Sequence, residues 1–362
     1  MMDLDSFSKA KDMIFPRDIL VGHDTLPQVS RMCDDFNFRK VGMIITGDAT
    51  YKSAGKAVEE YMKDGGYEIS VHKTTTATLA NVNDAVAEVK ERKAKFILAV
   101  GGGSKIDISK LVAKDCKIPF ISIPTSAAHD GIASGRASLK MDMGPKSIDA
   151  VSPMGVLADT SIIAKSPYRY LASGCADVIS NKTALMDWEF ARRLRNEPFS
   201  SSAYALAELS ANTIIENSKN IRPGLEDSTW IAMKPIIISG IAMAVAGSSR
   251  PTSGSEHMFS HALDILHPGT AMHGEQCGVG AIMMMFLHGG DWMSIRNALK
   301  DIGAPVNAEQ LGLSADDVID ALVEAPNIRK DRFTILGLWF TIAFCSLCFE
   351  TILKLSKKLS LI

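Results

Sequence analysis

Histidines gather in one short stretch of this 362-residue chain, between residues 253 and 274. Four of the eight histidines lie there, and if the stretch begins as a helix, His257 and His261 share one helical face. His273 returns from the next segment, whereas His267 has the setting of a loop residue. Neutral imidazole is the commonest protein ligand for zinc and similar ions. The stretch therefore predicts a metal site, and the alternative is a set of polar side chains on a helix edge and a loop.

A carboxylate is the second candidate ligand. Asp177 stands among the apolar residues of 174–179, where a buried charge is unfavourable unless it is paired or bound to a metal. It could instead cap a turn or pair with Lys182. Together with His257 and His273 it would supply one carboxylate and two imidazoles. Such a set leaves coordination positions open for a substrate oxygen, as catalytic metal sites do.

The sequence of the first half of the chain predicts a sheet against which the candidate metal ligands would be placed. Short apolar runs alternate there with helical patterns of about ten residues, which predicts a mostly parallel, doubly wound α/β sheet. The expected strands cover 41–46, 67–73, 96–100, 120–123 and 156–158, the expected helices cover 54–63 and 82–92, and a hairpin is expected at 138–141 and 147–151.

Strand patterns largely disappear in the second half, and Gly, Pro or Asn residues separate a series of helical patterns. We therefore expect an α/β domain over 1–165, an all-α domain over 166–362, and an active site in the cleft between them. The expected helices cover 168–190, 202–218, 227–246, 254–266, 278–288, 293–302 and 315–324.

A glycine loop follows the fully apolar strand at 96–100. Gly101, Gly102 and Gly103 allow a sharp turn and close approach of an anion to the backbone amides. Ser104 is expected to cap the next helix, with Asp107 three residues on, close to a capping box. The loop predicts a pyrophosphate site for a dinucleotide; the alternative is an ordinary tight turn.

Two further strand ends bear on cofactor binding. Thr125 and Ser126 follow the strand at 120–123 and suit ribose or nicotinamide contacts. An acidic residue at a strand end binds the adenosine ribose and repels a 2′-phosphate. If Gly47 holds that position, NADH and NADPH both fit; if Asp48 turns inward, NADH is favoured. We expect use of both.

Composition narrows the class of protein. Hydrophobic residues make up 46% and charged residues 22% of the chain, and the net charge is −2. These values describe a globular protein and give no basic excess for nucleic-acid binding. The six cysteines form no disulfide framework, and no secretory signal is evident, so a cytoplasmic protein is expected.

One stretch near the end has no charge. Phe333–Phe349 is seventeen residues long, at the lower limit for a bilayer span. It could equally be a buried helix or an oligomer contact, and we expect no stable membrane insertion.

The order of motifs resembles that of the iron-containing alcohol dehydrogenase superfamily, which includes glycerol dehydrogenases and dehydroquinate synthases. These motifs are GGGS-x-x-D-x-x-K, IPTS…HDG, GCAD, SGSEH…H and MHGE. The longer strings PTSAAHDGIASGRAS, ALMDWEFA and SGSEHMFSHALD are similar to its archaeal glycerol-1-phosphate branch. That branch sets the stereochemistry of ether-lipid backbones.

The resemblance implies reduction of dihydroxyacetone phosphate to sn-glycerol 1-phosphate by NADH or NADPH, with zinc as the usual metal. The zinc ligands would be Asp177, His257 and His273, and Asp177 and His257 would also contact the substrate. Asp130 would lie near substrate, and His261 or Asp130 would handle the proton. The cofactor motif would comprise Gly101, Gly102, Gly103, Ser104 and Asp107, with Thr125 and Ser126 as further contacts. A homo-oligomer is also expected.

Three other functions stay open at this point. The chain could be a glycerol dehydrogenase that acts on the unphosphorylated polyol. It could be a cyclase or lyase like dehydroquinate synthase, which uses NAD transiently and eliminates phosphate; an aspartate at position 177 argues against it, because that family has a glutamate ligand. A nucleotide-binding scaffold without catalysis is the third.

Overall fold

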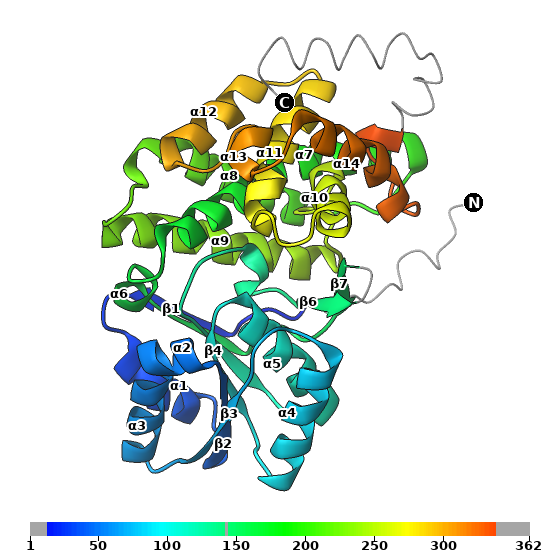
Figure 1. The fold of residues 1–362 in the computed structure, drawn as a ribbon. Helices are drawn as coiled ribbons and strands as arrows, with labels where there is room; N and C mark the ends of the chain where they lie inside the picture. Colours follow the sequence, from blue (N-terminus) through cyan, green and yellow to red (C-terminus); the bar gives the residue numbers. More distant parts are fainter. Residues whose placement is uncertain (1–12, 142–143, 338–362) are drawn as a thin grey trace, which may run out of the picture.

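A six-stranded parallel sheet forms the centre of the first part of the molecule (Figure 1). The computed structural model describes residues 13–141 and 144–337. The strand order is β1-β8-β5-β4-β2-β3, which places β4 and β5 in the middle. In chain order the strands are β1 (Asp18–Gly22), β2 (Val41–Thr46), β3 (Glu68–Lys73), β4 (Ile97–Gly101), β5 (Phe120–Pro124) and β8 (Gly155–Asp159).

Both faces of the sheet are covered by apolar side chains. Along β4, Ile97 and Ala99 belong to one buried cluster, while Leu98 and Val100 belong to another on the opposite face. A strand buried on both sides needs an unbroken apolar sequence, which explains the run FILAV. The helices α4 (Leu79–Glu91) and α5 (Gly103–Cys116) contribute to the first cluster, and α1 (Val29–Asp35) and α3 (Lys56–Asp64) contribute to the second. The predicted doubly wound sheet is confirmed.

Several short elements complete this part, including the 3₁₀ turn η2 (Leu26–Gln28) before α1 and the π-helical turn η3 (Tyr51–Gly55) before α3. The turn η4 (Asp130–Ile132) follows β5, and β6 (Arg136–Met141) pairs with β7 (Gly144–Asp149) as the predicted antiparallel hairpin. A short helix α2 (Asp48–Thr50) follows β2.

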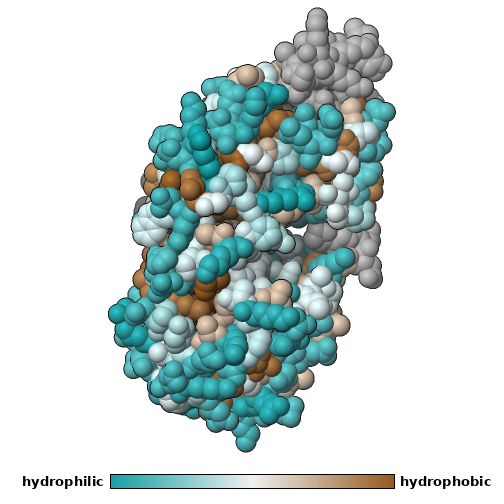
Figure 2. All heavy atoms as spheres, turned by 60° about the vertical axis from the view of Figure 1, so that its left-hand side comes forward, coloured by the Kyte–Doolittle hydropathy of each residue, from teal (hydrophilic) through white to brown (hydrophobic). Residues whose placement is uncertain are grey.

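Helices make up the rest of the described chain and lie above the carboxyl edge of the sheet (Figure 1). The surface is hollowed where the two parts meet (Figure 2). The helices are α6 (Thr160–Ile163), α7 (Tyr168–Arg195), α8 (Ser201–Glu216), α9 (Glu226–Ala246), α10 (Ser255–Leu266), α11 (His273–Leu287), α12 (Trp292–Ile302), α13 (Ala308–Leu311) and α14 (Ala315–Ile328). The division at residue 165 stays a prediction, since one hydrophobic cluster contains side chains of both parts.

Several elements differ from the expectations, among them the short helices α6 and α13, which were not predicted. Strand β1 and helix α1 were not predicted; β1 is a half-exposed edge strand of five residues, and its sequence DILVG lacks alternation. Helix α11 begins at His273 rather than at residue 278, because the Glu275 carboxylate accepts the Met272 backbone N–H at 2.9 Å and caps the helix start. This correction makes His273 the first residue of a helix.

The uncharged stretch Phe333–Phe349, and with it the expected membrane or oligomer contact, lies mostly outside the described residues. Within the described chain, α9 is the one helix long and apolar enough to cross a membrane, and 61% of its most apolar window is buried in the protein. Core helices of soluble proteins pass the same test.

Candidate active site

Three helices bring the predicted metal ligands together. Asp177 lies on α7, His257 on α10 and His273 at the start of α11. Close approach of these segments depends on two glycines in the predicted motifs. A side chain at Gly174 would collide with the Ala127 carbonyl, and one at Gly274 would collide with the backbone of α7.

The cluster has the dimensions of a metal site. Asp177 Oδ1 lies 3.6 Å from His257 Nε2 and 3.8 Å from His273 Nε2. Two ligands bound at ~2.0–2.1 Å to a tetrahedral ion lie ~3.4 Å apart, so the observed separations are only slightly longer. The three groups can therefore hold one ion with small movements.

Asp177 carries the strongest sign that a cation belongs here. The residue is 3% exposed, and its buried Oδ1 has no hydrogen-bond partner among the described residues. Its other oxygen accepts the backbone N–H of Asp130 at 3.0 Å. Burial, together with the charge of Asp130, raises the pKa of Asp177 to about 7. A carboxylate in this setting is destabilising without a positive partner, and a divalent ion would supply one.

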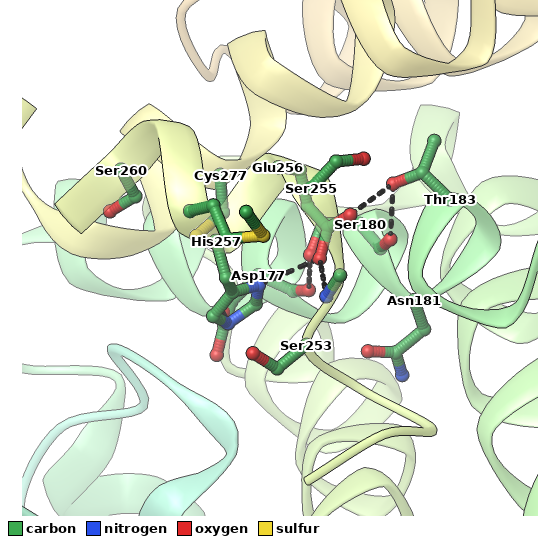
Figure 3. A network of polar contacts seen from close by, with 12 residues as sticks. Asp177, Ser180, Asn181, Thr183, Ser253, Ser255, Glu256, His257, Ser260 and Cys277 are labelled. Carbon is green, nitrogen blue, oxygen red and sulfur yellow. Dashed lines mark hydrogen bonds and ion pairs between the residues drawn. The ribbon is translucent and has the colours of Figure 1, made fainter. Parts of the chain in front are cut away.

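A buried carboxylate sets the orientation of His257. Its Nδ1 lies 2.9 Å from Glu256 Oε1 (Figure 3). Glu256 accepts the Nδ1 proton, so Nε2, the atom that faces Asp177, is the nitrogen that can offer a lone pair to a metal. Metal-binding histidines usually make such a hydrogen bond to a carboxylate or carbonyl.

A chain of hydrogen bonds sets the orientation of His273 in the same way. Its Nδ1 lies 3.0 Å from Ser260 Oγ, which donates to Gln276 Oε1 at 2.6 Å, and Gln276 Nε2 donates to Asp264 at 3.2 Å. Since the serine proton goes to Gln276, Nδ1 of His273 is the donor and its Nε2 lone pair is free. Burial lowers the pKa of His273 well below its usual value, which favours the neutral form that binds metal.

Cys277 is a fourth group that the sequence reasoning did not select. It lies one turn after His273 on α11, and its sulfur and the three ligand atoms all lie within 4.8 Å of one another. The sulfur is 3.6 Å from Nε2 and 3.9 Å from Nδ1 of His273. An atom nearly equidistant from both nitrogens lies beside the ring, not along the Nε2 lone pair where a shared ion would sit. The i, i+4 spacing from His273 was the signal that could have revealed it.

The two predicted proton-handling residues flank the cluster. Asp130 contacts Asp177 through its backbone, and its carboxylate accepts from Ser239 Oγ at 2.8 Å. The rings of His261 and His273 lie 5.8 Å apart. His261 Nδ1 is buried without a hydrogen-bond partner in the described part of the chain, and burial lowers the pKa of this imidazole to about 4.

The glycine loop lies at the carboxyl end of β4, as expected for a cofactor cradle. Gly101 ends the strand, Gly102 is the N-cap of α5 and Gly103 is its first residue. Ser104 is therefore inside the helix, and the expectation that it caps α5 is wrong. The helix starts earlier because Gly102 adopts the extended conformation of an N-cap (φ −79°, ψ −174°).

Asp107 has a different environment from the expected capping box. It is 5% exposed, pairs with Lys110 at 3.0 Å and accepts the Ser138 backbone N–H at 3.2 Å. The buried Lys110 ammonium also donates to the carbonyls of Gly131 and Arg136, both at 2.6 Å. These two residues tie the helix of the glycine loop to η4 and the hairpin. Asp107 would therefore influence cofactor binding only indirectly, by holding the start of α5 in place against η4 and the hairpin.

The segment 125–131 runs from the glycine loop to the metal cluster. The Thr125 backbone N–H donates to Gly101 at 3.1 Å, and Ser126 packs against Gly102. Further along, Asp130 reaches Asp177. One short segment therefore connects the predicted cofactor contacts with the predicted substrate and metal residues.

The end of β2 holds the residues predicted to select the cofactor. Asp48 has a side chain that is 84% exposed and 3.1 Å from Lys73, so it does not turn inward. Lys105 lies across Gly47 and donates to the Thr75 carbonyl. The group nearest to Gly47 from the glycine-loop helix is thus a cation.

Comparison with known proteins identifies the fold and the family. A model of the iron-containing alcohol dehydrogenase family matches residues 20–167. A probable glycerol dehydrogenase from Sinorhizobium meliloti has the same fold, with a TM-score of 0.74 at 16% identity over 88% of this chain and 91% of that one. The glycerol dehydrogenase of Schizosaccharomyces pombe gives 0.72 at 15% identity over 88% and 84%. The fold is therefore that of the iron-containing alcohol dehydrogenases.

Closer relatives define the branch. The glycerol-1-phosphate dehydrogenase of Methanosarcina mazei, named for the cofactor NAD(P)+, is 50% identical over 93% of this chain and 94% of its own. The protein of the same name from Methanothermobacter thermautotrophicus is 50% identical over 89% and 92%. The chain belongs to the glycerol-1-phosphate dehydrogenase family, and the predicted resemblance is confirmed.

Proposed function

We propose that this protein reduces dihydroxyacetone phosphate to sn-glycerol 1-phosphate with NADH or NADPH, and so supplies the glycerol backbone of archaeal ether lipids. The observation that carries the proposal is the buried, unpartnered Asp177 oxygen that two histidine Nε2 atoms face. Family membership at 50% identity gives the substrate class.

Asp177, His257 and His273 are the residues that would hold the metal, for which zinc is our choice. A divalent ion bound there would act as a Lewis acid that polarises the C2 carbonyl and stabilises negative charge on its oxygen. Glu256 and Ser260 keep both Nε2 lone pairs directed at the same point. Asp177 and His257 thereby also border the place where the substrate carbonyl must lie.

Proton delivery falls to His261 or Asp130. With a pKa lowered to about 4, His261 is neutral near pH 7 and passes a proton from one ring nitrogen while it accepts another at the second. Asp130 would act through a water molecule, since its carboxylate is held by Ser239.

Both cofactors fit the end of β2. Reduced nicotinamide supplies the hydride, and the pyrophosphate suits the free amides at the start of α5, which Gly101, Gly102 and Gly103 leave accessible. Asp48 points into solvent toward Lys73 and leaves room for a 2′-phosphate beside Gly47. Lys105 places a positive charge there.

A cytoplasmic, homo-oligomeric enzyme with a small-molecule substrate is part of the proposal. The four cysteines in the described chain are all free, which suits a reducing compartment. Size-exclusion chromatography with light scattering tests the oligomer; a monomer at micromolar concentration would contradict it.

The choice of ketone tests the proposed reaction. The metal-loaded protein should oxidise NADH or NADPH with dihydroxyacetone phosphate, and far more slowly with dihydroxyacetone. If only the unphosphorylated ketone reacts, the protein is a glycerol dehydrogenase. Release of inorganic phosphate without net cofactor oxidation would indicate a cyclase, and cofactor binding without any turnover would indicate a scaffold.

A further inference from the structure

Glu256 is a carboxylate buried next to the metal cluster without touching the predicted ion position. It is the second residue of α10 and is fully buried. Its Oε1 accepts from the Gly254 backbone N–H at 2.6 Å and from His257 Nδ1 at 2.9 Å, and its Oε2 accepts from Thr183 Oγ1 at 2.8 Å (Figure 3). Both carboxylate oxygens thus accept hydrogen bonds from donors on α7 and at the start of α10.

No lysine or arginine in the described chain forms an ion pair with Glu256, and the buried Arg332 acts on its charge only at longer range. Across residues 13–141 and 144–337, its one ion pair is with the His257 imidazole. Asp177 is the second buried carboxylate on that imidazole, at 3.6 Å. Two buried carboxylates around one histidine match the charge of a divalent cation, whereas burying them without a cation is unfavourable.

We propose that Glu256 is a positioning residue that fixes the His257 tautomer and, through that imidazole, supplies the second negative charge that balances the bound metal. The inference rests on the proposed metal site. It predicts two separable effects of Glu256, one on metal affinity and one on the net charge that an incoming anion meets at the metal.

Glutamine at this position removes the charge and keeps the geometry. In Glu256→Gln the amide oxygen still accepts from Gly254 and His257, and the amide nitrogen donates to Thr183 Oγ1. Thr183 can accept because its own proton has another acceptor, the Ser180 carbonyl at 2.8 Å. The variant therefore tests charge in an unchanged hydrogen-bond network.

Asp187 offers a control carboxylate. It lies on α7, is also fully buried, and accepts the Ser255 backbone N–H at the start of α10 at 2.7 Å. Its other oxygen accepts the Ile335 backbone N–H at 2.7 Å and pairs at 3.0 Å with His288, a histidine outside the cluster. Asp187→Asn removes a charge beside the same helix start together with one backbone hydrogen bond, so it controls for structural damage as well as for charge. Should this variant not fold, Thr183→Val serves instead, since it removes a donor to Glu256 and keeps the carboxylate.

The first measurement is the zinc dissociation constant of the metal-free proteins, by competition with a chromophoric chelator at pH 7. Glu256→Gln should bind zinc about 10- to 100-fold more weakly, and the control variant should stay close to wild type. Unchanged affinity in Glu256→Gln, or an equal loss in the control, would overturn the proposal. If wild type itself binds no zinc, the proposed function fails instead.

The second measurement separates charge from folding. Cobalt-loaded protein is titrated with azide, and the visible spectrum reports binding. The Glu256→Gln site carries one more positive charge, so azide should bind several-fold more tightly than to wild type. A general structural loss would not strengthen anion binding, so weaker or unchanged azide affinity would contradict the charge-balancing role.

Discussion

Asp177→Asn should stabilise the metal-free protein even though it removes a proposed metal ligand. In the folded, metal-free state the Asp177 carboxyl is 3% exposed and its pKa is raised from 3.8 to about 7 by burial and by the charge of Asp130. An asparagine carries no charge to bury. Its oxygen can keep the Asp130 N–H, and its amide can point at the two Nε2 atoms that now lie 3.6 and 3.8 Å from Oδ1.

The size and sign of the effect follow from the pKa. Each pKa unit corresponds to ~1.4 kcal/mol, so ionising Asp177 destabilises the metal-free fold by roughly 4 kcal/mol relative to the unfolded chain. A raised carboxyl pKa means that this penalty is absent below pH 3.8, grows between pH 3.8 and about 7, and is complete above it. The variant should therefore gain on wild type as pH rises through that range.

Urea unfolding in the presence of a chelator, followed by tryptophan fluorescence at pH 5 and pH 8, measures the difference. We expect Asp177→Asn to be more stable than wild type by a few kcal/mol at pH 8 and by less at pH 5. Added zinc should raise the stability of wild type and leave the variant unchanged, since only a ligand-binding native state gains from the ion. A variant that is less stable than wild type at pH 8 without metal would refute the reasoning.

The neighbouring residues give three further predictions. His257→Ala should weaken zinc binding by at least ~100-fold, whereas His261→Ala should leave it within a few-fold and lower kcat by about 10²- to 10⁴-fold; equal zinc loss in both would contradict the ligand assignment. Cys277→Ala should keep zinc affinity near wild type, because its sulfur lies beside the His273 ring, and a large loss by chelator competition would make it a ligand. Lys105→Met should raise the KM for NADPH about tenfold more than that for NADH, as expected for a lost phosphate contact, while Asp48→Ala should leave the ratio of the two KM values unchanged; the reverse pattern would assign selection to Asp48.

The central strands were predictable because burial on both faces requires unbroken apolar sequence. The run FILAV became β4, with alternate residues in two separate clusters. Strand β1 was missed for the opposite reason, since an edge strand with one neighbour needs neither a full apolar run nor a strict alternation. Its place beside β8 depends on contacts across more than a hundred residues of chain.

The start of α11 and the role of Asp107 show a second limit. Two glycines in the segment 273–278 suggested a break, yet capping by Glu275 starts the helix at His273. Asp107 was expected to complete a near capping box with Ser104 and is instead paired with Lys110 inside the protein. Local sequence indicates that a polar residue near a glycine-rich turn forms a hydrogen bond or an ion pair there. Which group it pairs with depends on the tertiary structure.

The ligand types were predictable from residue chemistry, and their surroundings were not. Histidine spacing alone allowed His257 and His261 as a pair, but the predicted ligand set was Asp177, His257 and His273, and the structure places these three around one point. The hydrogen bonds to Glu256 and Ser260 that orient the two rings join groups that are adjacent in sequence in the first case and 13 residues apart in the second. Nothing in a sequence distinguishes such a buried glutamate or serine from one on a surface.

The stereochemistry of the product tests the central claim most directly. Zinc-loaded protein is incubated with dihydroxyacetone phosphate and NADPH, and the glycerol phosphate formed is offered to an enzyme specific for the sn-3 enantiomer. The account predicts that the product is sn-glycerol 1-phosphate and resists that enzyme. Formation of sn-glycerol 3-phosphate, or no reduction of the ketone, would contradict it.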